Sequence, residues 1–378
     1  MLVEIETVDE SIQSHLGGQL RYLSNNGFEV AFIASDTGLL RKICDKEGVT
    51  GYSVHMNRDP SPVADLVSLW RLTRLLRHLR PDIVNYGTPK AGLLGAIASW
   101  LARVPVRVYT RHGLRHETLV GPLASAFLVI ERVIGRLSTN AVMVSESVRT
   151  RSAELGVLPR NATVLGPGSA NGVDVGRFSE LAHDATVRST FLERLHIPDS
   201  AFVIAFLGRI TPDKGINELV TAFASLQERH PEVDWRLLLA GSREDWDSLT
   251  DFTRDQICEN PRIYELGHTD PGPVLAAATV VCLPSYREGL GTVLLEASAA
   301  ERLIIGARST GIVDVIQHDQ TGLLVEPGDA AELSEAIYRT TDGALRDRLV
   351  RNARLRVATD FSQEAVWERW RAYFAALA

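Results

Sequence analysis

Two glutamates, Glu288 and Glu296, have seven residues between them, and each could accept hydrogen bonds from the hydroxyl groups of a sugar. The apolar run 280–283, which ends at a proline, predicts a short buried strand, and the run that begins at Thr292 predicts a helix. Glu288 is therefore expected in a glycine-rich loop at the carboxyl end of a strand, where open α/β sheets bind ligands, and Glu296 in the first turns of the next helix. The unpaired amides at the start of that helix form a seat for phosphate. Two glutamates at this spacing also occur by chance, so a structural role is the alternative.

A turn with a glycine and two cations precedes this segment in the chain and comprises Gly208, Arg209 and Lys214. The turn follows an apolar strand expected at 202–207 and precedes an amphipathic helix expected at 216–227. This order of elements can hold a pyrophosphate, because guanidinium, ammonium and helix amides all attract phosphate oxygens. The alternative is a solvated turn with two incidental cations.

Short apolar strands alternate with helices along the chain. In the first half, strands are expected at 2–6, 29–34, 82–86, 106–110 and 141–144, and helices at 18–25, 39–47, 91–101 and 121–138. In the second half, strands are expected at 202–207, 235–240, 262–266, 279–283, 302–305 and 323–325, and a helix rich in aromatic residues at 364–377. This alternation predicts parallel sheets with helices on both faces.

The length of 378 residues favours two domains, because one ordinary core does not grow that large. Glycine and proline punctuation at 166–172 marks the expected hinge. We therefore predict an α/β fold with two Rossmann-like, doubly wound domains that face a central cleft. The first domain is expected at 1–172, with a C-terminal helix at about 362–378 crossing back to it, and the second at 173–361.

The composition excludes several classes of protein. Three cysteines show neither paired nor metal-ligand spacing, which favours reduced thiols in a cytoplasmic protein. The N-terminus has no features of a signal peptide, and no apolar run is long enough to span a membrane. A net charge of −7 and the lack of a binding motif disfavour nucleic acid as a partner.

The positive charge of the chain is concentrated in residues 66–116, which hold nine lysines and arginines and a single acid, Asp82. This window includes a basic amphipathic helix, expected at 64–80, that carries Trp70. Such helices can lie on anionic membranes, which suggests peripheral association with the inner face of the plasma membrane. The alternative is an ordinary packed helix whose cations face water.

A series of short motifs runs nearly from end to end of the chain. In groups, these are Thr110-Arg-His112-Gly113, Asn171-Gly-Val-Asp174, Gly208-Arg209…Lys214-Gly215, Leu239-Ala-Gly241, Gly267-His268, Glu288-Gly-Leu-Gly…Leu295-Glu296-Ala and Thr321-Gly322…Gly328-Asp. In this order and spacing, the motifs resemble those of the retaining, nucleotide-sugar-dependent glycosyltransferases of family 4, which have the GT-B architecture, in the branch with bacterial capsule and exopolysaccharide transferases.

The resemblance implies how a nucleotide-sugar donor would be held. Arg209 and Lys214 would stabilise the departing nucleotide diphosphate without a metal or another cofactor. Glu296 would bind the ribose hydroxyls and Glu288 the hydroxyls of the transferred sugar, while the loop at Gly267 would contact the base. The full implied donor-binding set is Gly18, Gly208, Arg209, Lys214, Gly241, Gly267, His268, Glu288, Gly289, Leu290, Gly291, Thr292 and Glu296.

His112 completes the implied catalytic set of His112, Glu288, Arg209 and Lys214. In the family, a histidine at this position hydrogen-bonds the 6-hydroxyl of the sugar or the reacting centre; the alternative is a histidine satisfied within its loop. Gly18 would let the backbone approach the phosphates closely. The segment 8–16 before it is expected to be a loop, and its polar, acidic character departs from the family.

The resemblance also implies transfer with retention of configuration. A double displacement would need a second carboxylate across the sugar ring, and the sequence identifies none, which favours a same-face transfer in which the departing phosphate oxygen takes the acceptor proton. We expect transfer of a hexose or N-acetylhexosamine from a UDP-sugar to a polyprenyl-diphosphate-linked sugar. The alternatives are a soluble transferase with a small-molecule acceptor and a nucleotide-sugar epimerase. A dehydrogenase is disfavoured because neither glycine turn extends to Gly-x-Gly-x-x-Gly.

Overall fold

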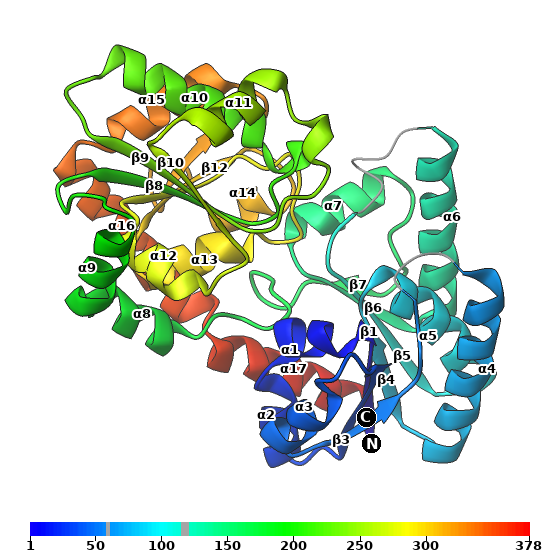
Figure 1. Cartoon of the computed structure of the whole chain (residues 1–378). Coiled ribbons are helices and arrows are strands. Elements are labelled where there is room, and N and C mark those ends of the chain that lie inside the picture. The colour runs from blue at the N-terminus through cyan, green and yellow to red at the C-terminus, as the bar shows by residue number, and fades with distance from the viewer. Residues whose placement is uncertain (58–60, 115–120) are drawn as a thin grey trace. The chain divides into compact units, whose positions relative to one another are not determined.

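The computed structural model describes residues 1–57, 61–114 and 121–378, and the chain divides into two compact units (Figure 1). Unit 1 comprises residues 1–172 and 363–378, and unit 2 comprises residues 173–362. Each unit is a parallel sheet with helices on both faces, so the prediction of two Rossmann-like, doubly wound domains is confirmed.

Unit 1 is built on a seven-stranded sheet with the order β3-β2-β1-β4-β5-β6-β7. Its strands are β1 (Leu2–Val8), β2 (Val30–Ser35), β3 (Thr50–Ser53), β4 (Ile83–Tyr86), β5 (Val106–Arg111), β6 (Asn140–Met143) and β7 (Ala162–Thr163). Its helices are α1 (Asp9–Leu16), α2 (Gln19–Asn25), α3 (Leu40–Glu47), α4 (Pro62–Leu79), α5 (Pro89–Leu101), α6 (Pro122–Leu137), α7 (Glu146–Glu154) and the C-terminal α17 (Gln363–Leu377).

Two apolar cores cover the two faces of this sheet. One face packs against α1, α2, α3 and α17, and the other against α4, α5 and α6 (Figure 1). Trp370 and Phe374 of α17 are buried in the first core, which is why the C-terminal helix belongs to unit 1. Its aromatic residues are therefore core residues, as their helical spacing indicates.

The segment expected to be a loop at 8–16 forms helix α1 instead. Asp9 begins the helix, and its carboxylate accepts hydrogen bonds from the backbone N–H groups of Thr37 and Leu39. Ile12 and Leu16, four residues apart, bury the apolar side of the helix. The polar composition concealed the helix, because only these two positions of the segment carry its contact with the core. The short edge strands β3 and β7 were also missed.

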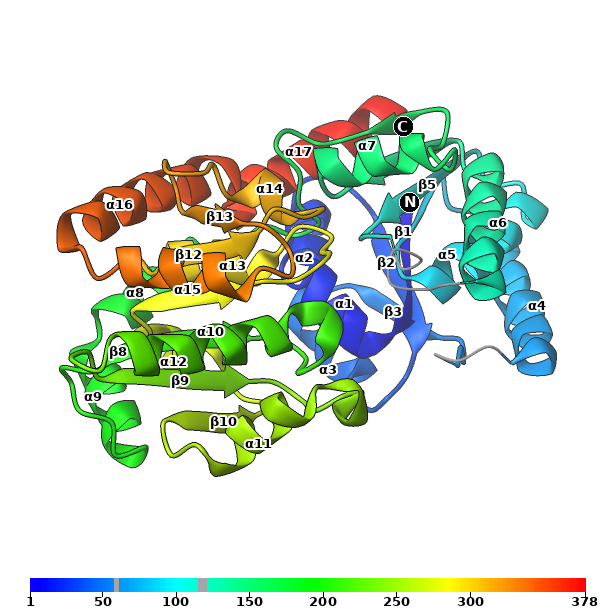
Figure 2. The same ribbon diagram turned by 90° about the horizontal axis from the view of Figure 1, so that it is seen from above.

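Unit 2 is built on a six-stranded sheet with the order β10-β9-β8-β11-β12-β13, and Figure 2 shows these strands side by side from β13 to β10. Its strands are β8 (Phe202–Leu207), β9 (Trp235–Ala240), β10 (Ile263–Gly267), β11 (Val280–Leu283), β12 (Leu303–Ala307) and β13 (Leu323–Val325). Its helices are α8 (Val175–His183), α9 (Ala185–Arg194), α10 (Ile216–Arg229), α11 (Asp251–Glu259), α12 (Pro271–Ala277), α13 (Thr292–Ala299), α14 (Ile312–Val315), α15 (Ala330–Arg339) and α16 (Gly343–Asp360), with 3-10 turns η2 (Pro212–Lys214) and η3 (Trp246–Ser248).

One continuous core fills unit 2. Helices α10, α11 and α15 cover one face of the sheet, and α12, α13 and α16 cover the other (Figure 1). The strands at the centre of this sheet are wholly apolar, as expected for strands covered on both faces.

The basic helix expected at 64–80 is α4. Leu72 and Leu76 face the core, whereas Arg71 and Arg74 are exposed. The helix also exposes an apolar stripe that the sequence analysis did not single out, formed by Val63, Leu66, Val67 and Trp70, with between 45% and 79% of each residue accessible. Arg115 of the basic window lies outside the described residues. Within residues 1–57, 61–114 and 121–378, no helix has the length and hydrophobicity that a membrane span requires.

Candidate active site

The strand order of unit 2 reverses between its two central strands, β8 and β11. From β8 the chain continues outward to β9 and β10, and from β11 it continues in the opposite direction to β12 and β13. The loops at the carboxyl ends of β8 and β11 therefore separate at a topological switch point, which is where open α/β sheets bind ligands. Both chemical motifs of the sequence follow these two strands.

Lys214 and Glu288 meet at this switch point. Lys214 ends the 3-10 turn η2 after β8, and Glu288 lies in the loop after β11. The Lys214 Nζ atom lies 2.5 Å from Glu288 Oε1, and the two side chains are only 15% and 18% exposed. The structure thus joins two residues that are seventy-four positions apart in the sequence and that were both predicted as catalytic.

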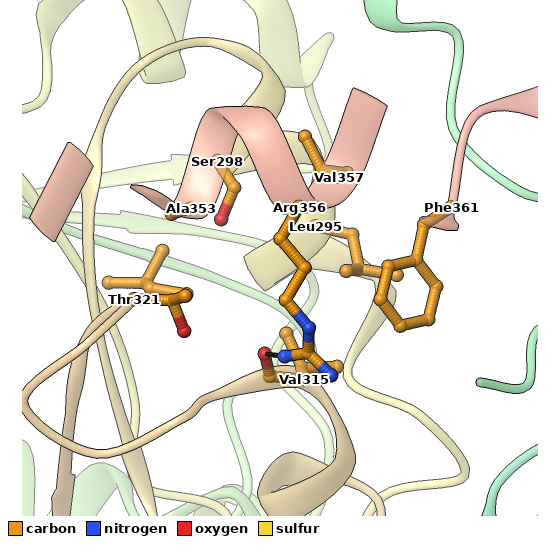
Figure 3. Close-up of a pocket in the computed structure, with 9 residues that line it drawn as sticks. Leu295, Ser298, Val315, Thr321, Ala353, Arg356, Val357 and Phe361 are labelled. Carbon is orange, nitrogen blue, oxygen red and sulfur yellow. Dashed lines mark hydrogen bonds between the residues drawn. The ribbon is translucent and has the colours of Figure 1, made fainter. Parts of the chain in front are cut away.

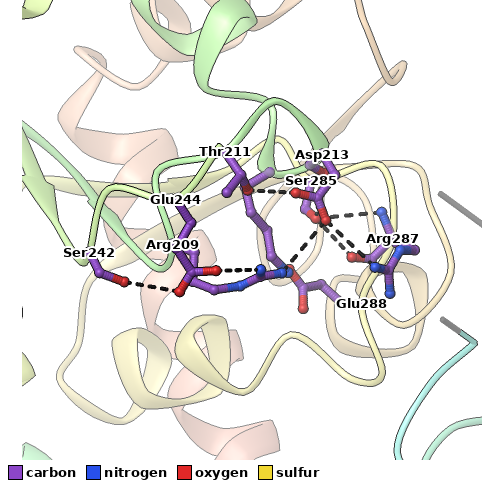
Figure 4. A network of polar contacts seen from close by, with 9 residues as sticks. Arg209, Thr211, Asp213, Ser242, Glu244, Ser285, Arg287 and Glu288 are labelled. Atoms are coloured by element: carbon purple, nitrogen blue, oxygen red, sulfur yellow. Dashed lines mark hydrogen bonds and ion pairs between the residues drawn. The ribbon is translucent and has the colours of Figure 1, made fainter. Parts of the chain in front are cut away.

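Arg209 belongs to the same polar network (Figure 4). Its guanidinium donates to Glu244 Oε2 at 2.9 Å and lies 3.8 Å from Asp213 Oδ2. Asp213 also lies 3.7 Å from a guanidinium nitrogen of Arg287, and its backbone oxygen accepts from the N–H of Tyr286. Asp213 therefore ties the loop after β8 to the loop after β11.

The loop that carries Glu288 is held by the end of strand β12. The N–H of Glu288 donates to the backbone oxygen of Thr310 at 2.9 Å. The hydroxyl of Ser309 donates to the backbone oxygen of Ser285 at 2.7 Å. Asp213, Ser309 and Thr310 were not predicted as site residues. Asp213 lies inside a motif that was recognised, whereas Ser309 and Thr310 could have been found only as polar residues a few positions after a predicted strand.

Glu296 lies in the second turn of α13, where it is only partly accessible. Burial raises the pKa of its carboxyl to about 7, an effect that Arg177 partly offsets and Asp270 reinforces. Arg177 and Asp270 pair with each other at 2.9 Å. The carboxyl of Glu296 is therefore divided between its protonated and ionised forms near neutral pH.

The remaining predicted donor-binding residues of unit 2 lie at the same edge of the sheet. The N–H of Gly208 donates to the oxygen of Ala240, and the N–H of Gly241 donates to the oxygen of Gly267, so these glycines follow one another across β8, β9 and β10. His268, which comes directly after β10, is exposed. The loop before α13 and the start of that helix hold Gly289, Leu290, Gly291 and Thr292.

His112 lies in unit 1, directly after strand β5. Its ring stacks on that of His15, the last-turn histidine of α1, with 4.5 Å between ring centroids, and its Nε2 atom lies 3.8 Å from Glu6 Oε1. Burial, with a smaller contribution from His15, lowers the pKa of His112 to about 4, and Glu6 partly opposes this change. His112 is therefore a neutral imidazole at neutral pH. Glu6 was not predicted as a neighbour of His112. The available signal was the presence of two acidic residues, Glu4 and Glu6, in a strand that was expected to be apolar.

Gly18 has a structural reason to be glycine that differs from the predicted one. Its N–H donates to Glu47 Oε1 at 2.9 Å, so in this structure that amide is already bonded and not directed at a phosphate. A side chain at this position would lie 2.6 Å from the ring of Trp367 on α17. The backbone, at a φ of 83°, therefore approaches an aromatic ring of its own unit, which explains the glycine without a ligand.

Two other features of unit 2 are separate from this site. A small pocket lies between α13, α16 and the turn after α14, and Arg356 within it donates to the backbone oxygens of Val315 and Asp314 (Figure 3). None of the predicted site residues lines this pocket. The triplet Asp245-Trp246-Asp247 has the Asp-x-Asp spacing of some metal sites, but both carboxylates are exposed at the turn η3.

Two Rossmann-like units in one chain agree with the GT-B architecture, and comparisons with known proteins identify the family. Residues 12–168 match the glycosyl transferase 4-like domain, and residues 201–342 match the glycosyl transferases group 1. The chain is 33% identical to the capsular polysaccharide biosynthesis glycosyltransferase CapM of Staphylococcus aureus over 97% of this chain and 94% of CapM. The chain belongs to the group 1 family of glycosyltransferases.

Further relatives agree with this assignment. A UDP-Gal:alpha-D-GlcNAc-diphosphoundecaprenol alpha-1,3-galactosyltransferase of Escherichia coli is 25% identical over 91% of this chain and 88% of that protein. The crystal structure of Anabaena HepE in complex with UDP and glucose has a TM-score of 0.81 at 18% identity and covers 99% of both chains. At that identity, the likeness to HepE establishes the shared fold.

Proposed function

We propose that this glycosyltransferase moves a hexose or N-acetylhexosamine from a UDP-sugar to a polyprenyl-diphosphate-linked sugar, in the biosynthesis of a cell-surface polysaccharide such as a capsule. The observation that carries the proposal is the meeting of Lys214 and Glu288 at the switch point of unit 2, with Arg209 in the same network. In a nucleoside-diphosphate sugar such as a UDP-sugar, the diphosphate is bonded directly to the sugar, and a cation beside a carboxylate can bind that pair of groups.

On the donor side, Arg209 and Lys214 stabilise the charge that grows on the departing diphosphate. The first amides of α13, which have no partner within their helix, add the favourable end of the helix dipole. Together these groups can supply the positive field without a metal. Glu296 accepts hydrogen bonds from the ribose, and the loop at Gly267 and His268 contacts the base. Uracil is proposed because related proteins are described with UDP or UDP-galactose.

At the transferred sugar, Glu288 binds hydroxyl groups and His112 hydrogen-bonds the 6-hydroxyl. Because His112 is neutral, it can donate one hydrogen bond and accept another without adding a positive charge near the reacting carbon. Transfer then proceeds on one face of the sugar with retention of configuration. The departing phosphate oxygen takes the proton of the acceptor hydroxyl, so no enzyme carboxylate is needed as a nucleophile.

The lipid-linked acceptor is supported by the relatives and by the surface of α4. CapM is described by its role in capsular polysaccharide, and the Escherichia coli relative by a diphosphoundecaprenol acceptor. Exposed arginines and the exposed apolar stripe of α4 suit an anionic membrane surface that also holds such a lipid. We therefore place the protein in the cytoplasm, bound peripherally to the inner face of the plasma membrane.

Two measurements on the full chain test this proposal. A panel of nucleotide sugars is screened by thermal shift, and the UDP-sugar that raises the melting temperature most is expected to be the donor. That donor is then incubated with a polyprenyl-diphosphate-linked N-acetylglucosamine, with a water-soluble glycoside, or with no acceptor, in the presence and absence of EDTA. We expect transfer to the lipid-linked acceptor, with retention and with no loss in EDTA. Transfer to the soluble glycoside alone would support a small-molecule acceptor, and UDP release with proton exchange at C2 would support an epimerase.

A further inference from the structure

Three side chains with metal-binding atoms converge at the carboxyl edge of the sheet in unit 1. Glu6 Oε1 lies 3.6 Å from His15 Nδ1 and 3.8 Å from His112 Nε2. One ligand atom from each of the three residues fits within 4.8 Å of the others. Among residues 1–57, 61–114 and 121–378, this is the one group of three potential metal ligands that meets this distance.

The fold of unit 1 brings these residues together from separate elements. Its strand order reverses between β1 and β4, so the loops after these strands diverge at a switch point. Glu6 lies near the end of β1, His15 on the helix that follows it, and His112 directly after β5. The hydroxyls of Thr7 and Thr88 lie 2.7 Å apart and tie the ends of β1 and β4 together.

The cluster has unused bonding capacity. Glu6 is only 3% exposed, and its Oε2 atom has no hydrogen-bond partner among the described residues. The Nδ1 atom of His15 is likewise buried and makes no hydrogen bond within the described residues, although Glu6 Oε1 lies 3.6 Å away. An unpartnered buried carboxylate oxygen carries a large desolvation cost, which a bound cation would offset.

Residue 87, between β4 and α5, keeps the space between these atoms open. A methyl group on Gly87 would lie 2.6 Å from His112 Nε2 and 2.7 Å from Glu6 Oε1. Those distances are too short for carbon, so any side chain at this position would displace the two potential ligands. Glycine at this position therefore leaves a gap beside two of the potential ligand atoms, His112 Nε2 and Glu6 Oε1.

We propose that Glu6, His15 and His112 form a binding site for a transition-metal dication such as Zn²⁺. Zn²⁺ favours a ligand set of two imidazoles and one carboxylate. Mg²⁺ does not favour this set, because it prefers oxygen ligands. Ligand atoms around tetrahedral zinc at about 2.0–2.1 Å are roughly 3.3 Å apart. The 3.6 Å and 3.8 Å from Glu6 to the two histidines therefore need only a small contraction, and the two imidazoles, with ligand atoms within 4.8 Å of each other, need to move closer together.

The consequence for catalysis rests on the function proposed above. A metal ion on His112 Nε2 occupies the nitrogen that we assign to the sugar hydroxyl, so the ion inhibits transfer. This role is compatible with transfer that needs no metal, because the diphosphate is assigned to Arg209 and Lys214 of unit 2. Added Zn²⁺ is therefore expected to inhibit the enzyme, and EDTA to restore full activity.

The site is tested on the full chain without any donor, so that its failure and the failure of the proposed function can be told apart. Co²⁺ is titrated and followed by its visible absorption, and Zn²⁺ and Mg²⁺ are titrated by calorimetry. We expect one Co²⁺ or Zn²⁺ per chain, an absorption band typical of tetrahedral cobalt, and no binding of Mg²⁺. Glu6→Gln and His15→Gln should each weaken Zn²⁺ binding at least tenfold.

Two further variants make the result specific. Gly87→Ala retains all three ligands but fills the gap between two of them, so it should also abolish binding. His183→Gln is the matched control, because His183 also lies 3.6 Å from a glutamate, Glu301, but on the exposed surface of unit 2. The affinity of the His183→Gln variant for Zn²⁺ should equal that of the wild type. Absence of cobalt binding in the wild type, or undiminished binding in Glu6→Gln and His15→Gln, would overturn the proposal.

Discussion

The two units have the same kind of sheet with a switch point at its centre, but they place different chemistry there. At the switch point of unit 2, the cations Arg209 and Lys214 meet the carboxylates Asp213 and Glu288. At that of unit 1, a single carboxylate, Glu6, meets two stacked histidines. A fold alone therefore does not specify a ligand: the charged set suits a diphosphate, whereas the imidazoles suit hydroxyl groups or a metal ion.

The strands behind the two sites differ as well. The central strands β8 and β11 of unit 2 are apolar throughout, so the polar groups of its site lie in the turns, loops and helix that follow these strands. In unit 1, a row of buried polar residues crosses the sheet beneath the site: Asn85 donates to Glu4 at 2.9 Å and accepts from Thr110 at 2.8 Å. Polar groups of unit 1 thus extend into its core, where the burial of an ionisable group affects stability.

The largest expected effect concerns the charged site of unit 2. Replacing Lys214 with alanine removes one group that stabilises the departing diphosphate and leaves Glu288 without its partner. The cost is about 2–4 kcal/mol in the barrier, so turnover should fall roughly a hundredfold or more. Arg209→Ala should act in the same direction. Turnover is measured as UDP release in the presence of acceptor.

Arg229→Ala is the matched control for these variants. Arg229 is exposed at the opposite end of α10, the helix that follows Lys214 and Gly215. Its loss should leave turnover unchanged within about threefold. If Lys214→Ala and Arg209→Ala also stay within that range, the loop after β8 is only a solvated turn and the contrast between the two units disappears.

The second prediction tests the buried polar row of unit 1 through stability. Burial raises the pKa of Glu4 to about 8, while Asn85 lowers it and Glu6 adds to the increase. Between pH 4.5 and 8 the folded state keeps a proton on Glu4 that the unfolded state has lost, so stability decreases as pH rises. Between pH 5 and pH 7, the free energy of unfolding of Glu4→Gln should therefore fall by about 2–3 kcal/mol less than that of the wild type. Urea unfolding of both proteins at these two pH values measures this difference.

The control for this experiment is internal. The measured quantity is the difference in the free energy of unfolding between Glu4→Gln and wild type, and the prediction concerns how this difference changes with pH. Any effect of the substitution that does not depend on pH therefore cancels. Glu296, whose pKa is raised to about 7, contributes equally to both proteins. An identical loss of stability with pH in the two proteins would show that Glu4 is ionised in the folded state.

The sequence predicts much of unit 2 and less of unit 1, for a physical reason. Apolar strands that end in glycine or proline turns are visible in a sequence, and the polar residues after β8 and β11 were identified by that pattern. The side chains of Glu6 and His15 gave no such signal. One lies within a strand and the other on a helix, and only the packing of α1 against the sheet brings them beside His112.

Gly18 shows how a contact distant in the sequence can account for a residue that a local pattern singled out. A glycine before a helix start suggested a close approach to phosphate, yet the neighbour that requires it is Trp367, some three hundred and fifty positions away in the chain. No local pattern contains that contact, because it depends on the C-terminal helix packing on unit 1. Local spacing identifies which residues can do chemistry, whereas long-range packing decides which of them are already engaged.

The third prediction separates the two glutamates of unit 2. Glu296→Gln should weaken donor binding about tenfold, whereas Glu288→Gln should mainly lower turnover of the bound donor by a similar factor, since a hydrogen bond to a charged group contributes about 1.5–3 kcal/mol. Donor affinity is measured by calorimetry and turnover at saturating donor. Equal loss of affinity in both variants, with turnover unchanged, contradicts the assignment.

The pKa of Glu296 determines how the effect of Glu296→Gln on donor affinity depends on pH. Above pH 7 the wild-type carboxylate can accept bonds from both ribose hydroxyls, and below pH 7 it becomes protonated and resembles glutamine. The difference in donor affinity between wild type and Glu296→Gln should therefore shrink as pH falls from 8 to 6. Titration of the diphosphate affects both proteins alike and cancels in the comparison.

The smallest expected effect concerns two basic helices, one in each unit. In α16 of unit 2, arginines bind the protein itself: Arg348 donates to the backbone oxygen of Asp319, and Arg354 pairs with Glu301. In α4 of unit 1, Arg71 is exposed beside Trp70, next to the apolar stripe, with 60% of Trp70 accessible. If α4 lies on an anionic membrane, its cations should contribute to binding and those of α16 should not.

Arg71→Gln should therefore reduce co-sedimentation with anionic vesicles at low salt about fivefold, because a cation near such a surface contributes about 1 kcal/mol. Arg351→Gln removes one exposed charge from α16 and should leave binding unchanged. Added salt should release the wild type, since the attraction is screened beyond about 10 Å at 0.1 M. If wild type ignores anionic vesicles at low salt, or if both variants bind equally well, α4 is an ordinary packed helix. A soluble acceptor then becomes the better hypothesis, while the assignments at the switch point of unit 2 are unaffected.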